Sequence, residues 1–194
     1  MKFLGIEKVG GGKFLHSYNI RYREKNGREK VYEMVSRDGN ITGHNDLLQH
    51  GTDAIVAIIT DKTDEHILLL HEFRLEQGQQ IYGLPGGLLE KGESPVQCLK
   101  RELFEETGLS LADVYEVLPS AACAVGISNE CAVCIFASAE GEIRPSDNAD
   151  EEIDARWFTR DEVLKLQQSE KFGSWALAFS WIWAHGRFPG KKEM

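Results

Sequence analysis

The sequence lacks a hydrophobic run long enough to cross a bilayer. Its longest strongly apolar segment, Trp175 to Ala184, is shorter than the roughly 20 residues that a membrane helix needs. Charged residues also interrupt the first eight positions before an apolar stretch of signal-peptide length develops. We therefore expect a soluble, cytoplasmic protein with no membrane partner.

Basic charge is also scarce. The 22 Lys and Arg residues are outnumbered by 31 Asp and Glu residues, which gives a formal net charge of −9. Broad binding to nucleic acids or to anionic membranes requires a basic face, so both partners are excluded. An anionic small substrate remains compatible, because divalent cations and a few arginines can reverse the local field.

Only four cysteines occur, at positions 98, 123, 131 and 134, which suits a reducing compartment. Cys131 and Cys134 have the C-x-x-C spacing of zinc and redox sites. They lie, however, in an apolar run typical of a strand, where side chains three positions apart point to opposite faces. A second such pair is missing, so we interpret these cysteines as buried small residues. The six scattered histidines likewise form no obvious catalytic unit with Ser or Cys.

Residues 1–48 have the pattern of a small antiparallel sheet. Two alternating runs, 13–24 and 28–37, are joined by Asn26-Gly27, the strongest hairpin signal that a sequence offers. A unit of this size is not stable alone. It must pack on the main domain, residues 49–194, or on another subunit.

The main domain begins with two apolar runs, 53–60 and 66–73, that are expected to be neighbouring strands. A glycine-rich loop at 83–87 follows them. Further strands are expected at 113–118 and 130–138, and helices at about 159–169 and 174–185. This order predicts an α/β or α+β sandwich.

One helix in this domain has well-marked ends. Ser94 is a capping residue, Pro95 suits the first helical position, and Gln97 completes a capping box. Gly108 supplies the left-handed residue that ends a helix. The sequence therefore predicts a helix from Pro95 to just before Gly108.

The second half of this helix carries three carboxylates on one face, those of Glu102, Glu105 and Glu106. Like charges one turn apart, and acids near a helix C-terminus, each cost a few tenths of a kcal/mol up to about 1 kcal/mol. A solvated acidic face would explain them, but so would a bound cation. Oxygen ligands favour Mg²⁺ or Mn²⁺, and Glu93 in the preceding loop offers a fourth carboxylate.

The spacing of the whole segment decides between these readings. It matches G-x5-E-x7-R-E-U-x-E-E-x-G-U, with U an apolar residue, at every specified position. A chance match is on the order of 10⁻⁹ per window. The matched residues are Gly87, Glu93, Arg101, Glu102, Leu103, Glu105, Glu106, Gly108 and Leu109. This segment resembles the signature box of the Nudix hydrolase superfamily.

The resemblance implies an α/β/α sandwich with a mixed sheet that hydrolyses a pyrophosphate bond with Mg²⁺, or Mn²⁺ as a substitute. It implies that Glu102 and Glu106 are the principal metal ligands, that Glu105 shares in ligation, and that the Gly86 carbonyl adds an oxygen. Arg101 would orient the carboxylates of the box. The structural residues of the box would be Gly87, Glu93, Arg101 and Gly108.

Looser matches extend the resemblance to the ADP-ribose pyrophosphatase subfamily. The segment 32–37 resembles its W-E-x-V-x-R strand, Phe73-Arg74 its F-R pair, and 126–130 its G-x-S-x-E segment. These matches imply a homodimer in which the N-terminal unit helps to build the substrate pocket. The implied substrate contacts are Tyr32, Glu33, Arg37, Arg74 and Glu130, and the implied general base is either Glu151 or Glu152.

The sequence departs from the subfamily in three places. Gly83 stands where a glutamate is usual, Tyr32 replaces a tryptophan, and Ala124-Val125-Gly126 replaces S-P-G. The missing glutamate and proline weaken the assignment to ADP-ribose itself, so the substrate that the resemblance implies is ADP-ribose or a related nucleotide sugar. Two alternatives stay open: a nucleoside triphosphate pyrophosphohydrolase of the MutT type, and a non-catalytic nucleotide sensor. The N-terminal unit argues against the first and the complete set of box glutamates against the second.

Overall fold

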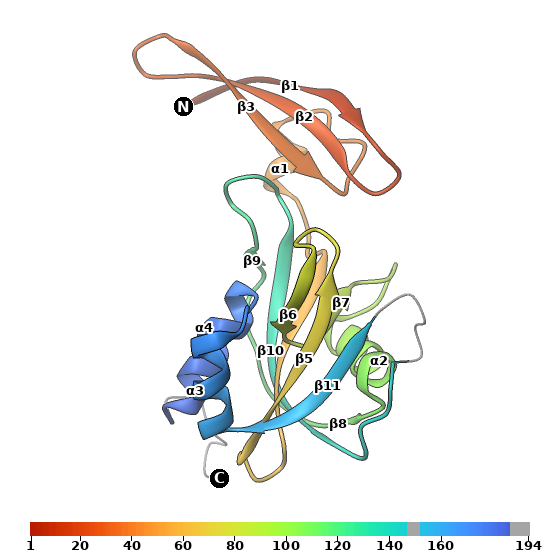
Figure 1. The fold of residues 1–194 in the computed structure, drawn as a ribbon. Coiled ribbons are helices and arrows are strands. Elements are labelled where there is room, and N and C mark those ends of the chain that lie inside the picture. Colours follow the sequence, from red (N-terminus) through yellow and green to blue (C-terminus); the bar gives the residue numbers. More distant parts are fainter. Residues whose placement is uncertain (147–151, 187–194) are drawn as a thin grey trace. The chain divides into compact units, whose positions relative to one another are not determined.

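The computed structural model describes residues 1–146 and 152–186, which divide into two compact units (Figure 1). The first unit contains Met1–Asp53 and Ser120–Ala132. The second unit contains Ala54–Pro119 and the chain from Val133 onward. Each unit is described by itself.

The first unit is built on a three-stranded antiparallel sheet in the order β1 (Lys2–Gly11), β2 (His16–Arg23) and β3 (Glu29–Ser36). The turn between β2 and β3 contains Gly27 at φ 88°, a left-handed conformation that glycine adopts without strain. A short helix, α1 (His44–Leu48), follows β3. A small core lies on the sheet and contains Tyr18, Ile20, Met34 and Ile41.

A segment distant in sequence completes the first unit. The backbone N–H of Val35 on β3 donates to the carbonyl of Ile127 at 2.9 Å. The two-residue strand β9 (Ala121–Ala122) pairs with Cys131 and Ala132 at the start of β10 (Cys131–Glu140). Residues 120–132 therefore belong with the N-terminal sheet, although about 80 residues of chain separate them.

The second unit contains seven strands of an eight-stranded mixed sheet, whose eighth strand is β9 of the first unit. Its central path runs β11 (Ile153–Thr159), β5 (His66–Arg74), β4 (Ala54–Thr60), β10 and β8 (Ser110–Val117). The short strands β6 (Gln79–Gly83) and β7 (Gly86–Leu88) pair with β5 and β4 respectively. The last residue of β6 and the first two residues of β7 fall in the segment 83–87, where the sequence predicted a glycine-rich loop, because pairing with distant strands leaves no local pattern.

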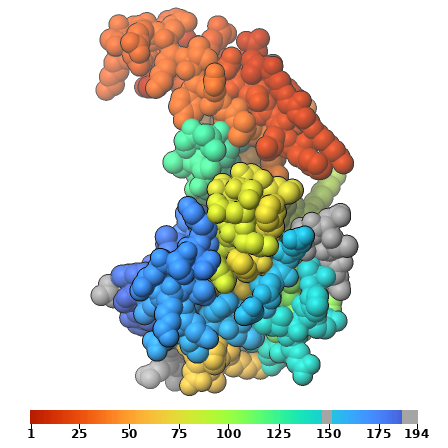
Figure 2. Space-filling model, viewed as in Figure 1, coloured from red at the N-terminus to blue at the C-terminus, as the bar shows by residue number. Residues whose placement is uncertain are grey.

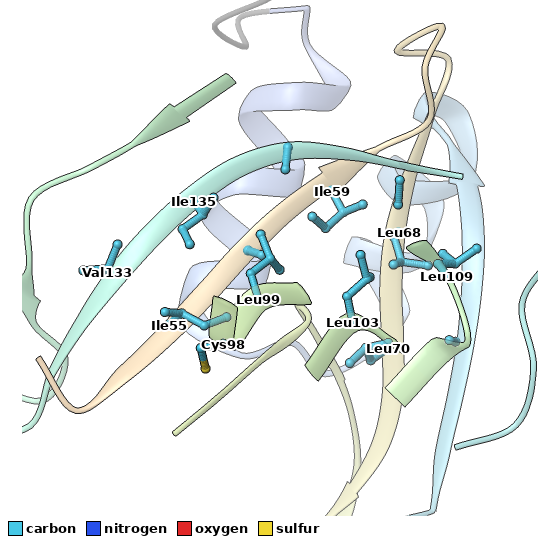
Figure 3. Packing of buried hydrophobic residues seen from close by; sticks show 14 residues of the cluster. Ile55, Ile59, Leu68, Leu70, Cys98, Leu99, Leu103, Leu109, Val133 and Ile135 are labelled. Carbon is cyan, nitrogen blue, oxygen red and sulfur yellow. The ribbon is translucent and has the colours of Figure 1, made fainter. Parts of the chain in front are cut away.

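One face of this sheet is covered by α2 (Pro95–Thr107). Ser94 caps this helix in a capping box with Gln97, and Gly108 ends it at φ 74°. Leu99 and Leu103 of α2 are fully buried and point towards Ile55, Ile59, Leu68 and Leu70 of the two central strands (Figure 3). Burial of a leucine side chain contributes about 1.5–3 kcal/mol, so these contacts fix α2 on the sheet.

The opposite face is covered by α3 (Arg160–Ser169) and α4 (Ser174–Ala184). In Figure 2 the blue atoms of these helices form a continuous layer on the second unit. Side chains alternate along the strands, so Ile67, Leu69 and Cys134 point into this second core. Trp183 of α4 is fully buried there, and its indole N–H donates to Asp64 at 2.9 Å.

Helices therefore cover both faces of a mixed sheet, and a small antiparallel sheet accompanies them. This confirms the predicted fold class. No helix in the described part of the chain is long and apolar enough to span a membrane.

Candidate active site

The acidic helix and the glycine-rich strand share one pocket of about 320 Å³ in the second unit. Its lining comes from β5, from the β6–β7 segment and from α2. The lining residues are Glu72, Arg74, Leu84, Gly86, Gly87, Leu88, Glu102 and Glu106. Five of them, namely Arg74, Gly86, Gly87, Glu102 and Glu106, are residues that the sequence singled out.

Gly86 and Gly87 lie so close to neighbouring atoms that a Cβ atom at either position would clash with them. A Cβ atom on Gly86 would lie 2.5 Å from the carbonyl oxygen of Ile55, with which β7 pairs. A Cβ atom on Gly87 would lie 2.0 Å from Oε1 of Glu102. The space that a side chain would fill at position 87 is therefore occupied by the carboxylate of Glu102.

Glu102 and Glu106 lie one helical turn apart on α2, and both reach the pocket. The side chain of Glu102 is 16% exposed, and Glu106 is 8% exposed as a whole residue. Buried carboxylates require compensation by hydrogen bonds or by positive charge. Both side chains interact with other residues of the described chain. Their carboxylate oxygens are also ligands that suit a hard divalent cation.

Arg101 joins the other carboxylates of the segment. Its Nε and Nη2 donate to the two oxygens of Glu93 at 3.1 and 3.0 Å. Its Nη1 donates to Glu102 at 2.8 Å and to Glu105 at 3.2 Å, and Nη2 also donates to the Leu88 carbonyl. One guanidinium therefore connects the loop before α2 with two consecutive turns of the helix.

These contacts change the acidities nearby. Hydrogen bonds from Arg101 lower the pKa of Glu93 to about 2, and the backbone N–H of Glu90 acts in the same direction. Burial raises the pKa of the Cys98 thiol to about 12, and the charge of Glu93 adds to this effect. Glu93 is thus an anion over the physiological range, and Cys98 remains a neutral thiol.

Glu105 differs from the other two acids of the helix. Its side chain is 50% exposed, and its carboxylate meets Arg101. In residues 1–146 and 152–186, no group of three His, Cys, Asp or Glu side chains is preformed as a metal-binding cluster. The residues nevertheless fit a divalent cation by their chemistry, since the carboxylates of Glu102 and Glu106 line one pocket together with Gly86 and Gly87.

β5 supplies the remaining charged residues of the pocket. Leu68 and Leu70 point into the core beneath α2, and Glu72 and Arg74 continue on the same face by strand alternation. Nη1 of Arg74 donates to both oxygens of Glu72, at 2.9 and 3.1 Å. The sequence analysis missed Glu72, although its period-two relation to Leu70 and Arg74 was a usable signal.

Four of the residues predicted to contact substrate lie in the first unit. Tyr32 is half-exposed on β3, and its hydroxyl donates to the Gly126 carbonyl at 2.5 Å. Nε of Arg37 donates to Glu130 at 2.7 Å. Glu33 lines a pocket of about 400 Å³ together with Tyr18 and Ile127. The G-x-S-x-E segment and the β3 segment, both singled out by resemblance, therefore meet within one unit.

The two candidates for the general base are placed differently. Glu152 is exposed immediately before β11, and its carbonyl accepts a hydrogen bond from the Phe73 N–H at 3.4 Å. Glu151 lies outside the described residues.

The four cysteines are all unpaired thiols, and Cys98 and Cys134 are buried. Burial raises the pKa of Cys134 to about 12. Cys134 packs in the core beneath α3 and α4, as its interpretation as a buried small residue requires.

An α/β/α sandwich with an acidic helix behind a glycine-rich strand defines the Nudix class of fold. A family model described as the NUDIX domain matches residues 50–177, and the chain belongs to this family. The predicted family and enzyme class, a Nudix hydrolase, are thereby confirmed.

Individual relatives agree with this assignment. The ADP-sugar pyrophosphatase of Mus musculus is 29% identical over 149 residues, which cover 72% of this chain and 63% of the relative. The ADP-ribose pyrophosphatase of Bacillus subtilis is 25% identical over 173 residues, 88% of this chain and 84% of the relative. A crystal structure of an ADP compounds hydrolase has the same fold, with a TM-score of 0.70, 20% identity, and coverage of 97% and 98% of the two chains.

Proposed function

We propose that this Nudix hydrolase cleaves the pyrophosphate bond of a nucleoside diphosphate joined to a second group. ADP-ribose or a related nucleotide sugar is the substrate that best fits the names of the relatives. Water attacks one phosphorus, the P–O–P bond breaks, and the products are a nucleoside monophosphate and a sugar phosphate. The observation that supports the proposal is the single pocket that Glu102, Glu106 and Arg74 line together.

The acidic residues of the pocket would bind the metal ion. Glu102 and Glu106, with the Gly86 carbonyl and Glu105 as further donors, would hold Mg²⁺, or Mn²⁺ as a substitute. When bound, a divalent cation supplies neutralisation of phosphate charge and polarisation of an attacking water. Glu102 and Glu105 both accept hydrogen bonds from Arg101, which would orient their carboxylates for the cation.

Arg74 would bind a phosphate, since a guanidinium matches phosphate oxygens in shape and charge. We propose that the nucleoside part of the substrate is contacted by four residues, namely Tyr32, Glu33, Arg37 and Glu130. Glu152 or Glu151 would accept the proton of the attacking water.

We also propose that the protein is a cytoplasmic homodimer, with residues 1–48 as its dimerisation and pocket-building unit. The support is physical, because the small core of four buried residues in this unit is too limited for independent stability. Light scattering coupled to size-exclusion chromatography tests this directly. A monomeric mass at micromolar concentration contradicts the dimer.

A substrate screen with Mg²⁺ tests the activity. ADP-ribose, GDP-mannose, NADH, diadenosine polyphosphates and oxidised dNTPs are incubated with the protein, and the products are identified by mass. We expect AMP and ribose 5-phosphate from ADP-ribose. Preferential hydrolysis of oxidised dNTPs would instead support the MutT type, and no hydrolysis of any compound would support a sensor.

Glu106→Gln tests the role of the helix. We expect turnover to fall by about three orders of magnitude while the fold is kept, because the carboxylate charge is lost without loss of volume. Glu116→Gln is the matched control, since Glu116 is exposed on β8 outside the pocket. Near-wild-type turnover of Glu106→Gln at saturating Mg²⁺ would refute the metal assignment.

A further inference from the structure

Glu72 has a place in the pocket that the resemblance to the Nudix family did not assign. It shares the α2-facing side of β5 with Arg74 and lines the pocket with Glu102 and Glu106. Its side chain is 22% exposed, against 47% for Arg74. The carboxylate is therefore the more enclosed partner of the pair, and the arginine is the more accessible one.

The hydrogen bonds of Arg74 fix the plane of its guanidinium. Nη1 donates to both oxygens of Glu72, and Nε donates to Oε1 of Glu76 at 3.1 Å. Within the described parts of the chain, these hydrogen bonds use Nη1 and Nε of Arg74, and Nη2 takes no part in them. Two of the three guanidinium nitrogens are thus held by carboxylates, and the third, Nη2, remains available to bind an anion in the pocket.

A carboxylate in this position has a cost for substrate binding. Glu72, Glu102 and Glu106 all bring negative charge to a pocket that, under the proposed function, receives a diphosphate. A like charge near a phosphate weakens its binding by simple electrostatics. A role for Glu72 must therefore be one that outweighs this repulsion.

We propose that Glu72 is a positioning residue that holds Arg74 in the orientation in which it binds a phosphate of the substrate. This inference rests on the proposed function and deepens it. Without Glu72, the long arginine side chain regains rotamer freedom, and that freedom must be lost again when the substrate binds.

Steady-state kinetics on ADP-ribose distinguish positioning from mere repulsion. We expect Glu72→Ala to raise KM about ten-fold and to change kcat less than about three-fold, since a preorganised binding contact is lost. Glu72→Gln keeps one acceptor oxygen and is expected to restore part of the affinity. A fall in KM in either variant would mean that Glu72 acts as a repelling charge and would overturn the proposal.

A double-mutant cycle tests whether Glu72 acts through Arg74. In the Arg74→Ala background we expect Glu72→Ala to change KM less than about two-fold, because nothing is left to position. The same ten-fold effect in both backgrounds would overturn the proposal. So would a marked rise in the Mg²⁺ concentration needed for half-maximal rate, which would make Glu72 a metal ligand.

A matched control lies on the neighbouring strand. Asp154 and Arg156 of β11 form the same kind of pair two residues apart, with Arg156 Nε donating to Asp154 at 3.0 Å. This pair is largely exposed and lies outside the pocket. Asp154→Ala should leave KM within about two-fold of the wild type.

A binding readout separates this inference from the proposed function. Calorimetry with α,β-methylene-ADP and Mg²⁺ measures affinity without turnover, and we expect Glu72→Ala to weaken it about ten-fold. If no sugar nucleotide is hydrolysed but this loss of affinity is found, the proposed function fails and the positioning role stands. Unchanged affinity in Glu72→Ala, with an active wild type, overturns the positioning role alone.

Discussion

Gly87 and Glu102 meet so closely that a side chain at position 87 would displace the Glu102 carboxylate. A Cβ atom there would lie 2.0 Å from Oε1 and 2.1 Å from Cδ of Glu102. Such distances are far below van der Waals contact. The glycine of β7 therefore determines where the first carboxylate of α2 can lie.

Gly87→Ala is expected to displace the Glu102 carboxylate and to lower kcat/KM by at least about ten-fold, since small misplacements at a reacting centre are costly. Gly51→Ala is the control, because a Cβ at Gly51 meets no atom within 4 Å. Kinetics and thermal melting of both variants make the comparison. An active Gly87→Ala enzyme would show that the position of Glu102 is unimportant.

Arg101→Lys is expected to lower the free energy of unfolding by about 1–3 kcal/mol, because one ammonium cannot replace the forked contacts to Glu93, Glu102 and Glu105. Urea unfolding measures the change. Arg156→Lys, whose side chain is 65% exposed, should change stability by less than about 0.5 kcal/mol. Equal stabilities for both variants would contradict a central role for Arg101.

Glu93 gives the protein a defined acid sensitivity. Hydrogen bonds from Arg101 lower its pKa from the ordinary 4.5 to about 2, so the folded state binds the proton less readily than the unfolded state. The resulting stabilisation is present above pH 4.5 and is lost as the pH falls towards 2. In Glu93→Gln we expect a shallower decline of the urea midpoint over this range. An identical pH dependence in both proteins would contradict the ion pair.

The two buried thiols should be inert. Burial raises the pKa values of Cys98 and Cys134 to about 12, so neither forms much thiolate at neutral pH. We expect iodoacetamide to leave both unmodified in the native protein and to modify both after unfolding. Peptide mass mapping identifies the sites. Rapid native labelling of Cys98 would show that the loop before α2 opens readily.

Local chemistry made much of the second unit predictable. The ends of α2 follow from Ser94, Gln97 and Gly108, and the start of α3 follows from Thr159 and Glu162, because caps act within one turn. The apolar runs that became β4 and β5 were long enough to recognise. The acidic face of α2 was visible for the same reason, since its spacing is set by one helix.

Long-range pairing made the remainder unpredictable. β6 and β7 are short, β7 contains two glycines among its three residues, and both are strands only because β5 and β4 offer them partners. The contact between Val35 and Ile127 joins segments far apart in the sequence. Strand alternation alone places Glu72 on the same face as Leu70 and Arg74, but that this face of β5 meets α2 is a property of the assembled sheet.

The alternation along β5 also constrains how this strand can change. Ile67 and Leu69 lie in one core, whereas Leu68 and Leu70 lie in the other. Deletion of a single residue within the strand would exchange the two sets and carry Arg74 to the far side of the sheet. The loop at 61–65 can tolerate insertions and deletions. The number of residues in β5 between its core leucines and Arg74, however, must stay the same.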